Sequence, residues 1–156
     1  MFLSRAVYVS RPRFTVRPPV LEGELLRIAN AGLSHNPRDG ITGVLAIDSE
    51  VFIQALEGER GVVSRTLARI VADPRHNELE IADISEIGER AFEDWAVAFA
   101  DLEALPLSDA RRVDHRTQPA EALLERLLRI RKTGVVACRS VALGSRAAPS
   151  SQAARI

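Results

Sequence analysis

The stretch from Ile41 to Gly58, ITGVLAIDSEVFIQALEG, most constrains what this chain can fold into. It predicts two β-strands, 41–48 and 50–58, joined by a short hairpin connection at DSE. Apolar side chains fall on both faces of the second strand, so both faces of the sheet need a cover. Gln54 stands between large apolar neighbours, where a buried amide without partners costs about 1–3 kcal/mol. The partner of Gln54 is therefore a question about function.

Strand and helix patterns alternate along the rest of the chain. The helix after the first strand is expected to end at SHNPRDG, because Pro37 disfavours helix at Asn36. The next helix is expected to end at Pro74 and to carry an apolar stripe of Val63, Leu67, Ile70 and Val71. The predicted elements are, in order, strand 5–10, helix 20–33, strands 41–48 and 50–58, a helix within 59–74, and strands 78–88 and 95–101.

The order β-α-β-β-α-β-β predicts a ferredoxin-like α+β fold with one extra strand. We expect a five-stranded mixed sheet with two helices on one face. A C-terminal helix over 119–131 offers apolar side chains either to the other face or to a partner chain. The segment 134–143, GVVACRSVAL, fits a short strand or a continuation of that helix. The apolar residues of the helix are Leu123, Leu124, Leu127, Leu128 and Ile130.

Composition excludes several classes of protein. The formal net charge is zero, which argues against binding to nucleic acid or to anionic membrane surfaces. No segment approaches the roughly 18 apolar residues that span a bilayer. The one cysteine, Cys138, excludes an internal disulfide and a Cys-based zinc site. We expect a cytoplasmic protein.

Motifs of common enzyme chemistry are missing. There is no Gly-rich phosphate loop and no serine at nucleophile-elbow spacing. The three histidines, His35, His76 and His115, lack metal-ligand spacing. We therefore expect a binding or sensing domain without turnover rather than an enzyme.

Four separated segments carry a family resemblance: VYVS, HNPRDGITGVLAIDSEVFIQALEG, RIVADPRH and RAFEDWAVAF. In this order they resemble the BLUF family of blue-light sensors that bind flavin, and the combination is specific where any single segment is weak. The resemblance covers about Arg5 to Leu102. It implies a flavin-binding sensor domain at 1–102 and a helical extension at 103–143, and composition adds a disordered tail at 144–156.

The resemblance implies roles for the residues at matching positions. Tyr8, Gln54 and Trp95 would form the photoactive relay. FAD is the implied cofactor, although the ring contacts do not distinguish it from FMN or riboflavin. Taken singly, these residues have plainer interpretations, such as a core tyrosine or a surface ion pair between Arg69 and Asp73. The residues implied to line or bond the flavin are Ile28, His35, Asn36, Gln54, Arg69, Asp73 and His76.

A photochemical mechanism is also implied by the resemblance. Light makes flavin a strong oxidant, and Tyr8 would pass an electron and a proton toward the ring with Gln54 as relay. The Gln54 amide would be left rotated or tautomerised, a change of hydrogen bonds in a low-dielectric site. The signal would pass to the C-terminal extension, to a downstream protein partner or to a second copy of the chain.

One departure from the family pattern lies two residues after Trp95. Val97 stands where many members have methionine, and valine has neither the sulfur nor the flexible arm of methionine. Val97 keeps a second hypothesis open, a flavin-less interaction module built on the same scaffold. A third, a small enzyme of the acylphosphatase type, would need an anion-binding loop at SRPRFTVRPP. Two prolines there directly follow arginine and remove N–H donors.

Overall fold

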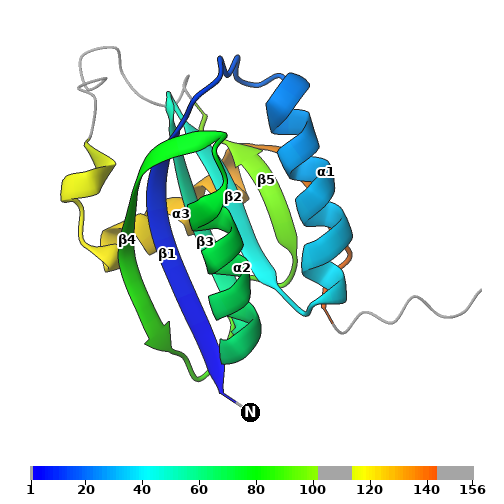
Figure 1. Cartoon of the computed structure of the whole chain (residues 1–156), viewed down its shortest axis with the longest axis vertical. Coiled ribbons are helices and arrows are strands. Elements are labelled where there is room, and N and C mark those ends of the chain that lie inside the picture. The colour runs from blue at the N-terminus through cyan, green and yellow to red at the C-terminus, as the bar shows by residue number, and fades with distance from the viewer. Residues whose placement is uncertain (1, 102–113, 144–156) are drawn as a thin grey trace, which may run out of the picture.

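The computed structural model describes residues 2–101 and 114–143. The predicted tail (144–156) and the first part of the predicted extension (103–113) lie outside these residues. The described residues form a six-stranded sheet between two helical layers (Figure 1). None of their helices is long and apolar enough to span a membrane. The strands are β1 (Leu3–Pro12), β2 (Thr42–Asp48), β3 (Val51–Glu59), β4 (His76–Glu86), β5 (Trp95–Phe99) and β6 (Val135–Arg139).

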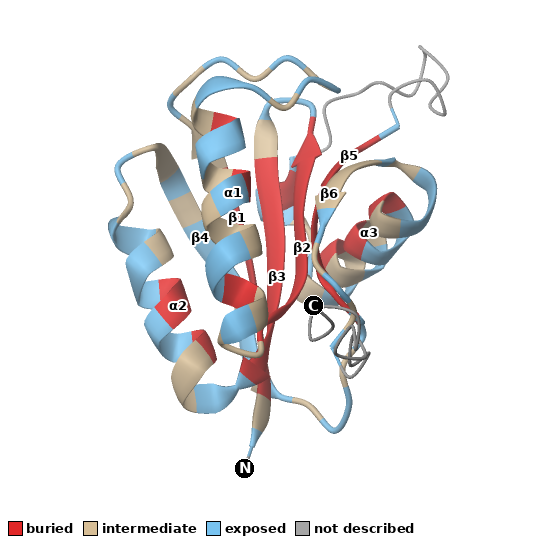
Figure 2. Ribbon diagram, turned by 90° about the vertical axis from the view of Figure 1, so that its right-hand side faces the viewer, coloured by how far each residue is buried: buried red, intermediate tan, exposed pale blue. Residues whose placement is uncertain are grey.

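The strand order across the sheet is β4-β1-β3-β2-β5-β6. The first four strands pair antiparallel, and β5 adds to β2 in parallel. Helices α1 (Gly23–Arg38) and α2 (Arg60–Ala72) cover one face, and α3 (Ala120–Thr133) covers the other (Figure 2). The predicted ferredoxin-like α+β fold, with two helices on one face and the C-terminal helix on the other, is confirmed.

The predicted count of five strands is one short, because residues 135–139 form β6. Gly134 ends α3 and donates its backbone N–H to the Ile130 carbonyl at 2.8 Å. The turn is tight: a Cβ at position 134 would lie 2.4 Å from the Phe99 carbonyl oxygen. The chain therefore reverses beside β5, and the apolar residues after Gly134 pair with the open edge of that strand.

Helix α1 extends further than predicted, through Asn36 and Pro37 to Arg38. Pro37 lies in the last turn, and the helix ends one residue after it, at Arg38, so no further turn depends on the hydrogen bond that proline removes. The next donors find partners nearby, since Asp39 N–H donates to the His35 carbonyl at 3.0 Å and Ile41 N–H to the Asn36 carbonyl at 2.8 Å. Asn36 is thereby held on the last helical turn instead of in a loop.

The inward stripe of α2 differs at one position from the prediction. Val63 and Leu67 are buried, Ile70 is half-buried, and Val71 is exposed. Thr66 takes the inward position instead, because residues spaced by three and four lie on one side of a helix. A threonine thus faces the sheet between α1 and α2.

On the second face, α3 buries Leu123, Leu127 and Ile130 against the sheet. Two ion pairs fix the helix in place. Arg126 Nη2 lies 2.9 Å from Asp48 Oδ2 on β2, and Arg131 Nη2 lies 2.8 Å from Asp94 Oδ2 in the segment before β5. His115, in a short 3-10 helix (η2, His115–Thr117), lies 2.9 Å from the same Asp48 oxygen.

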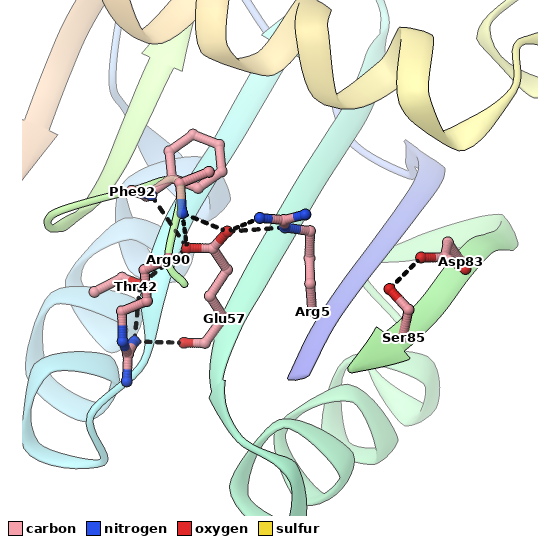
Figure 3. A network of polar contacts seen from close by, with 8 residues as sticks. Arg5, Thr42, Glu57, Asp83, Ser85, Arg90 and Phe92 are labelled. Atoms are coloured by element: carbon pink, nitrogen blue, oxygen red, sulfur yellow. Dashed lines mark hydrogen bonds and ion pairs between the residues drawn. The ribbon is translucent and has the colours of Figure 1, made fainter. Parts of the chain in front are cut away.

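A buried carboxylate, Glu57, lies on this second face of β3 (Figure 3). Its oxygens accept hydrogen bonds from Arg5 at 2.8 Å and from the backbone N–H groups of Ala91 and Phe92 at 3.0 and 3.1 Å. Arg90 donates to the Glu57 carbonyl oxygen at 2.9 Å. The segment that leads into β5 is therefore tied to β3 by a charged cluster.

Candidate functional site

A cavity of about 280 Å³ lies between α1, α2 and the sheet. Its walls come from β1, β2, β3 and β5, from both helices, and from the segment after α2 up to the first residue of β4. All the residues to which the resemblance assigns a role line this cavity, although their roles stay predictions. They are Tyr8, Ile28, His35, Asn36, Gln54, Arg69, Asp73, His76 and Trp95.

Tyr8 and Gln54 are brought together by strand register. They lie directly opposite each other in the antiparallel pair β1·β3 and therefore share a face. The Tyr8 hydroxyl donates to Gln54 Oε1, and the two side chains are only 2% and 4% exposed. The amide nitrogen of Gln54 has no hydrogen-bond partner among the described residues. The oxygen of the Gln54 amide is therefore satisfied, and its nitrogen can still donate to a further acceptor.

The electrostatic surroundings keep Tyr8 protonated. Burial raises the pKa of the Tyr8 hydroxyl far above its ordinary value, and the nearby Asp73 carboxylate raises this pKa further. A neutral phenol is an O–H donor, which is the role that Tyr8 has toward Gln54. Loss of the proton alone would leave a phenolate anion, which burial and the Asp73 carboxylate disfavour.

The last turn of α1 contributes Asn36, which is 7% exposed. Its side-chain amide has no hydrogen-bond partner within the described part of the chain. His35, its neighbour, also lines the cavity but is exposed. An amide both donates and accepts, so Asn36 presents an open donor and acceptor pair at the cavity.

The turn after α2 departs from the sequence interpretation. Asp73 does not brace Arg69, because the chain leaves the helix at Asp73 with extended backbone angles. Asp73 instead accepts from the Arg75 guanidinium at 2.6 and 3.0 Å and from the Arg75 backbone N–H at 2.9 Å. These hydrogen bonds lower the pKa of Asp73. Arg69 instead donates to the Thr66 hydroxyl at 3.4 Å and lies 3.9 Å from Asp39.

His76, the first residue of β4, joins three elements at the cavity. Its Nε2 lies 2.6 Å from the Ile70 carbonyl oxygen on α2, and its Nδ1 lies 2.8 Å from the Ser10 hydroxyl on β1. Because a carbonyl only accepts, Nε2 carries a proton. The ring lies edge-on to Tyr8, with centroids 6.3 Å apart. Both ring nitrogens are thus engaged by the protein.

Trp95 begins β5 and is 2% exposed. Its indole Nε1–H is the one fully buried side-chain polar atom without a hydrogen-bond partner in the described residues. Val97 follows on the same face and is fully buried. It lies level with Leu45 on β2, which in turn lies opposite Gln54 on β3. Leu45 therefore separates position 97 from the glutamine.

Sequence reasoning missed several residues of the cavity wall. Arg75 stands inside the RIVADPRH segment, so that segment held the signal for it. No periodicity distinguishes the others from ordinary core residues. The lining residues without a predicted role are Ala31, Gly32, Leu45, Phe52, Thr66, Ile70 and Arg75.

The cavity fits a flat ligand with an apolar body and a polar edge. Ile28, Leu45, Phe52 and Ile70 provide apolar walls, as small-molecule sites commonly have. The open amides of Asn36 and Gln54 provide the few polar groups that orient such a ligand. The cavity matches the ring of a flavin, which has apolar faces and an edge of carbonyl oxygens and ring nitrogens.

Comparisons with known proteins agree with this geometry. The profile of the family "BLUF: Sensors of blue-light using FAD" matches residues 3–98. The solved dark-state structure of BlrB, a BLUF protein, is 32% identical with a TM-score of 0.66, over 81% of this chain and 95% of that one. A structure of Klebsiella pneumoniae BlrP1 with FMN and cyclic diGMP is 26% identical with a TM-score of 0.56, over 82% of this chain and 30% of that one.

A curated relative is the photoactivated adenylate cyclase subunit beta of Euglena gracilis. It is 30% identical over 96 residues, which make up 58% of this chain and 11% of that protein. The chain therefore matches only a small part of the length of this relative.

The fold and the cavity together define a domain of ferredoxin-like type with a cavity between its two helices and its sheet. The chain belongs to the BLUF family of flavin-binding blue-light sensors.

Proposed function

We propose that this chain is a blue-light photoreceptor that binds flavin non-covalently in the cavity and signals by rearranging the hydrogen bonds of Tyr8 and Gln54. The observation that supports this most directly is the buried Tyr8–Gln54 hydrogen bond beside an unpartnered amide nitrogen. The nitrogen is at the cavity, where a ligand edge can supply the hydrogen bond that the described residues do not.

The proposed ring contacts follow from the open groups. Asn36 and the Gln54 nitrogen would bond the polar edge of the ring, while Ile28 and Ile70 would contact its faces. Arg69 is largely exposed and can donate to a ring carbonyl or to the flavin tail. FAD is the proposed flavin by family definition. FMN and riboflavin share the same ring, and the BlrP1 structure is one with FMN.

A bound flavin that has absorbed blue light supplies a strong oxidant. Tyr8 is the residue placed to respond, because its proton already points at Gln54 Oε1. Loss of the electron and the proton together leaves no net charge on the phenol, which the buried site favours. Return of both restores Tyr8, so the reaction has no product and no turnover.

The side chain of Gln54 can adopt two hydrogen-bond arrangements. Its amide offers an acceptor oxygen and a donor nitrogen on one planar group, and only the oxygen has a partner among the described residues. Rotation exchanges the atom that faces Tyr8, whereas tautomerisation moves a proton from the amide nitrogen to Oε1, so that this oxygen can donate. Neither change moves the residue. The two arrangements differ in hydrogen bonds within a low-dielectric site, where such differences are enlarged.

The proposed output passes to the C-terminal extension, to a protein partner or to a second copy of the chain. Gln54 lies on β3, two strands from β5, and β5 carries Trp95 at the cavity and pairs with β6. The Euglena relative is a photoactivated adenylate cyclase subunit by name. An effector of that kind is a candidate partner, whether fused or separate.

Absorption spectroscopy tests the proposal. The purified full chain should be yellow, its spectrum should shift to the red after blue light, and the shift should relax in the dark. Tyr8→Phe should keep the flavin and lose the shift. Thr133→Val, which removes a hydroxyl on the opposite side of the sheet, should behave as wild type. Normal photoswitching of Tyr8→Phe would contradict the relay, and protein that stays colourless after flavin addition would support the flavin-less interaction module.

A further inference from the structure

Position 32 on α1 faces the indole ring of Trp95 at very short range. A Cβ atom at this position would lie 2.1 Å from Trp95 Cη2, 2.5 Å from Cζ3 and 2.6 Å from Cζ2. Cβ contacts under 3.0 Å essentially never occur in proteins. Any side chain at position 32 would therefore displace either the helix or the indole ring.

Glycine is not required at position 32 by the backbone. Gly32 lies inside α1 and does not adopt a left-handed conformation. Glycine is among the poorest helix formers, second only to proline. A residue that weakens its own helix and serves no turn must be explained by the space that it leaves free, and Trp95 fills that space.

The backbone of Trp95 is held on both sides. On one side it pairs in parallel with β2 at Gly43. On the other, its N–H donates to the Ser140 hydroxyl at 3.0 Å, and its carbonyl accepts from the Ser140 N–H at 2.8 Å. Any displacement at this contact therefore falls on the side chain of Trp95 or on α1 and not on β5.

The indole of Trp95 is held by shape and not by a hydrogen bond within the described part of the chain. Its Nε1–H is buried without a partner there, which is unfavourable for an indole. Without steric constraint, rotation of the side chain would bring that N–H to an acceptor or to water. Close packing against α1 at Gly32 is the contact that opposes this.

We infer that Gly32 is the positioning residue of Trp95: the missing side chain at position 32 lets the indole ring lie against α1 as an inner wall of the cavity. The contact joins α1, which carries Asn36, to β5. The inference about placement stands on packing alone. Its meaning for flavin binding rests on the proposed function, because the indole then limits the space open to a flavin ring.

The test compares four variants of the full chain: Gly32→Ala, Trp95→Phe, the double variant, and Gly61→Ala. Gly61 is the matched control, since it also lies in a helix and its added Cβ would meet only flexible side-chain ends at 3.3 Å. The chain has one tryptophan, so its nitrogen–proton NMR spectrum contains a single indole N–H signal. The urea unfolding midpoint is recorded for every variant, and the indole signal for each variant that keeps Trp95.

Gly32→Ala should lower the urea midpoint, shift the indole signal and speed its exchange with solvent several-fold. Gly61→Ala should leave the signal unchanged and the midpoint equal or higher. In the Trp95→Phe background the same Gly32→Ala change should cost little, because a phenyl ring lacks the outer atoms of the indole. An unchanged indole signal with a midpoint at or above that of the wild type would overturn the inference.

Two further outcomes are decisive. If Gly32→Ala does not fold, the double variant should fold, and a double variant that fails while Trp95→Phe alone folds would overturn the inference. Flavin content is measured separately by absorbance. Wild-type protein without flavin or without a light response would refute the proposed function, whereas the NMR and urea results would still decide the role of Gly32.

Discussion

Gln54 and Glu57 are buried polar residues three positions apart on β3, and they face opposite sides of the sheet. Gln54, 4% exposed, points toward α1 and α2 and has one hydrogen bond among the described residues. Glu57, fully buried, points toward the α3 side and accepts from Arg5 and from two backbone N–H groups (Figure 3). The amide nitrogen of Gln54 has no partner among the described residues, whereas both carboxylate oxygens of Glu57 accept hydrogen bonds.

The same contrast holds for the two sides of the sheet. On the α3 side, Asp48 and Asp94 each have an arginine partner from α3. On the cavity side, the amides of Asn36 and Gln54 and the indole N–H of Trp95 are left with open capacity in the described structure. Buried polar groups are normally satisfied, so the grouping of these open groups on one side supports the proposed flavin site. Clusters whose polar groups bond to one another, as on the α3 side, stabilise the fold.

The largest effect on stability should come from removing Glu57, the carboxylate at the centre of the hydrogen-bonded cluster on the α3 side. Glu57→Ala leaves the Arg5 guanidinium and two backbone donors without their acceptor, and should cost about 3–5 kcal/mol in the free energy of unfolding. Urea denaturation measures this. The control is Glu86→Ala, which breaks the exposed pair with Arg60 and should cost at most about 1 kcal/mol. Equal losses in the two variants would contradict the structural role of Glu57.

A smaller effect is expected at Gln54. Gln54→Leu removes the acceptor of the buried Tyr8 hydroxyl and should cost about 1–3 kcal/mol in unfolding free energy. Adding Tyr8→Phe removes the orphaned donor and should recover most of that loss. Additive losses in the double variant, measured by urea denaturation, would show that the two side chains do not form a coupled pair.

Asn36 should affect binding and not stability. Asn36→Ala removes an amide with no partner among the described residues, so the unfolding free energy without flavin should change by less than about 0.5 kcal/mol. Flavin affinity, measured by titration, should fall by up to about tenfold, as for one lost hydrogen bond. Asn30→Ala, at an exposed position of the same helix, should change neither quantity. Unchanged affinity in Asn36→Ala would remove this residue from the binding site.

The smallest effect near neutral pH comes from titration of Asp48. Burial alone would raise the pKa of its carboxyl, but hydrogen bonds from His115 and Arg126 outweigh burial and hold the pKa below its usual 3.8. The unfolded chain therefore takes up the proton first as the pH falls. Stability from Asp48 is present above about pH 3.8 and is lost below it, as the pH passes through the folded-state pKa.

Urea midpoints between pH 3 and pH 7 check this expectation. Asp48→Asn should show a shallower loss at acidic pH than wild type. Some acid dependence should remain, because the pKa of Asp73 is also lowered, by its hydrogen bonds from Arg75. An equally steep loss in Asp48→Asn would show that Asp48 does not contribute to the acid sensitivity.

Local patterns predicted most of the fold, and the failures have physical reasons. Strand alternation placed Trp95 and Val97 on one face because sheet geometry is strictly periodic. The end of α1 was misjudged because Pro37 is costly within a helix but tolerable in its last turn. The sixth strand was left undecided because a four-residue apolar run, 135–138, becomes a strand only where an unpaired edge such as that of β5 is available.

For the site, sequence patterns identified residue types better than their partners. The pair of Tyr8 and Gln54 was implied by the family resemblance, and the register of β1 and β3 places the two residues opposite each other. Asp73 was paired with the wrong arginine, since spacing of four along a helix implies contact only while the helix continues. On sequence alone, Gly32 is only a residue that weakens its helix. Its meaning depends on Trp95, more than sixty positions away in the sequence, and no local pattern could show that.

The free energy that holds α3 against the sheet limits how far a rearranged hydrogen bond could move this helix. Leu123, Leu127 and Ile130 are almost completely buried beneath the helix, and their burial is worth on the order of 5–9 kcal/mol. One rearranged hydrogen bond at Gln54 changes the free energy by only about 0.5–1.5 kcal/mol. Full release of α3 would therefore need more free energy than the proposed rearrangement at Gln54 supplies. The accessible response is a change in tilt or strand geometry, unless a partner covers the apolar face that α3 leaves.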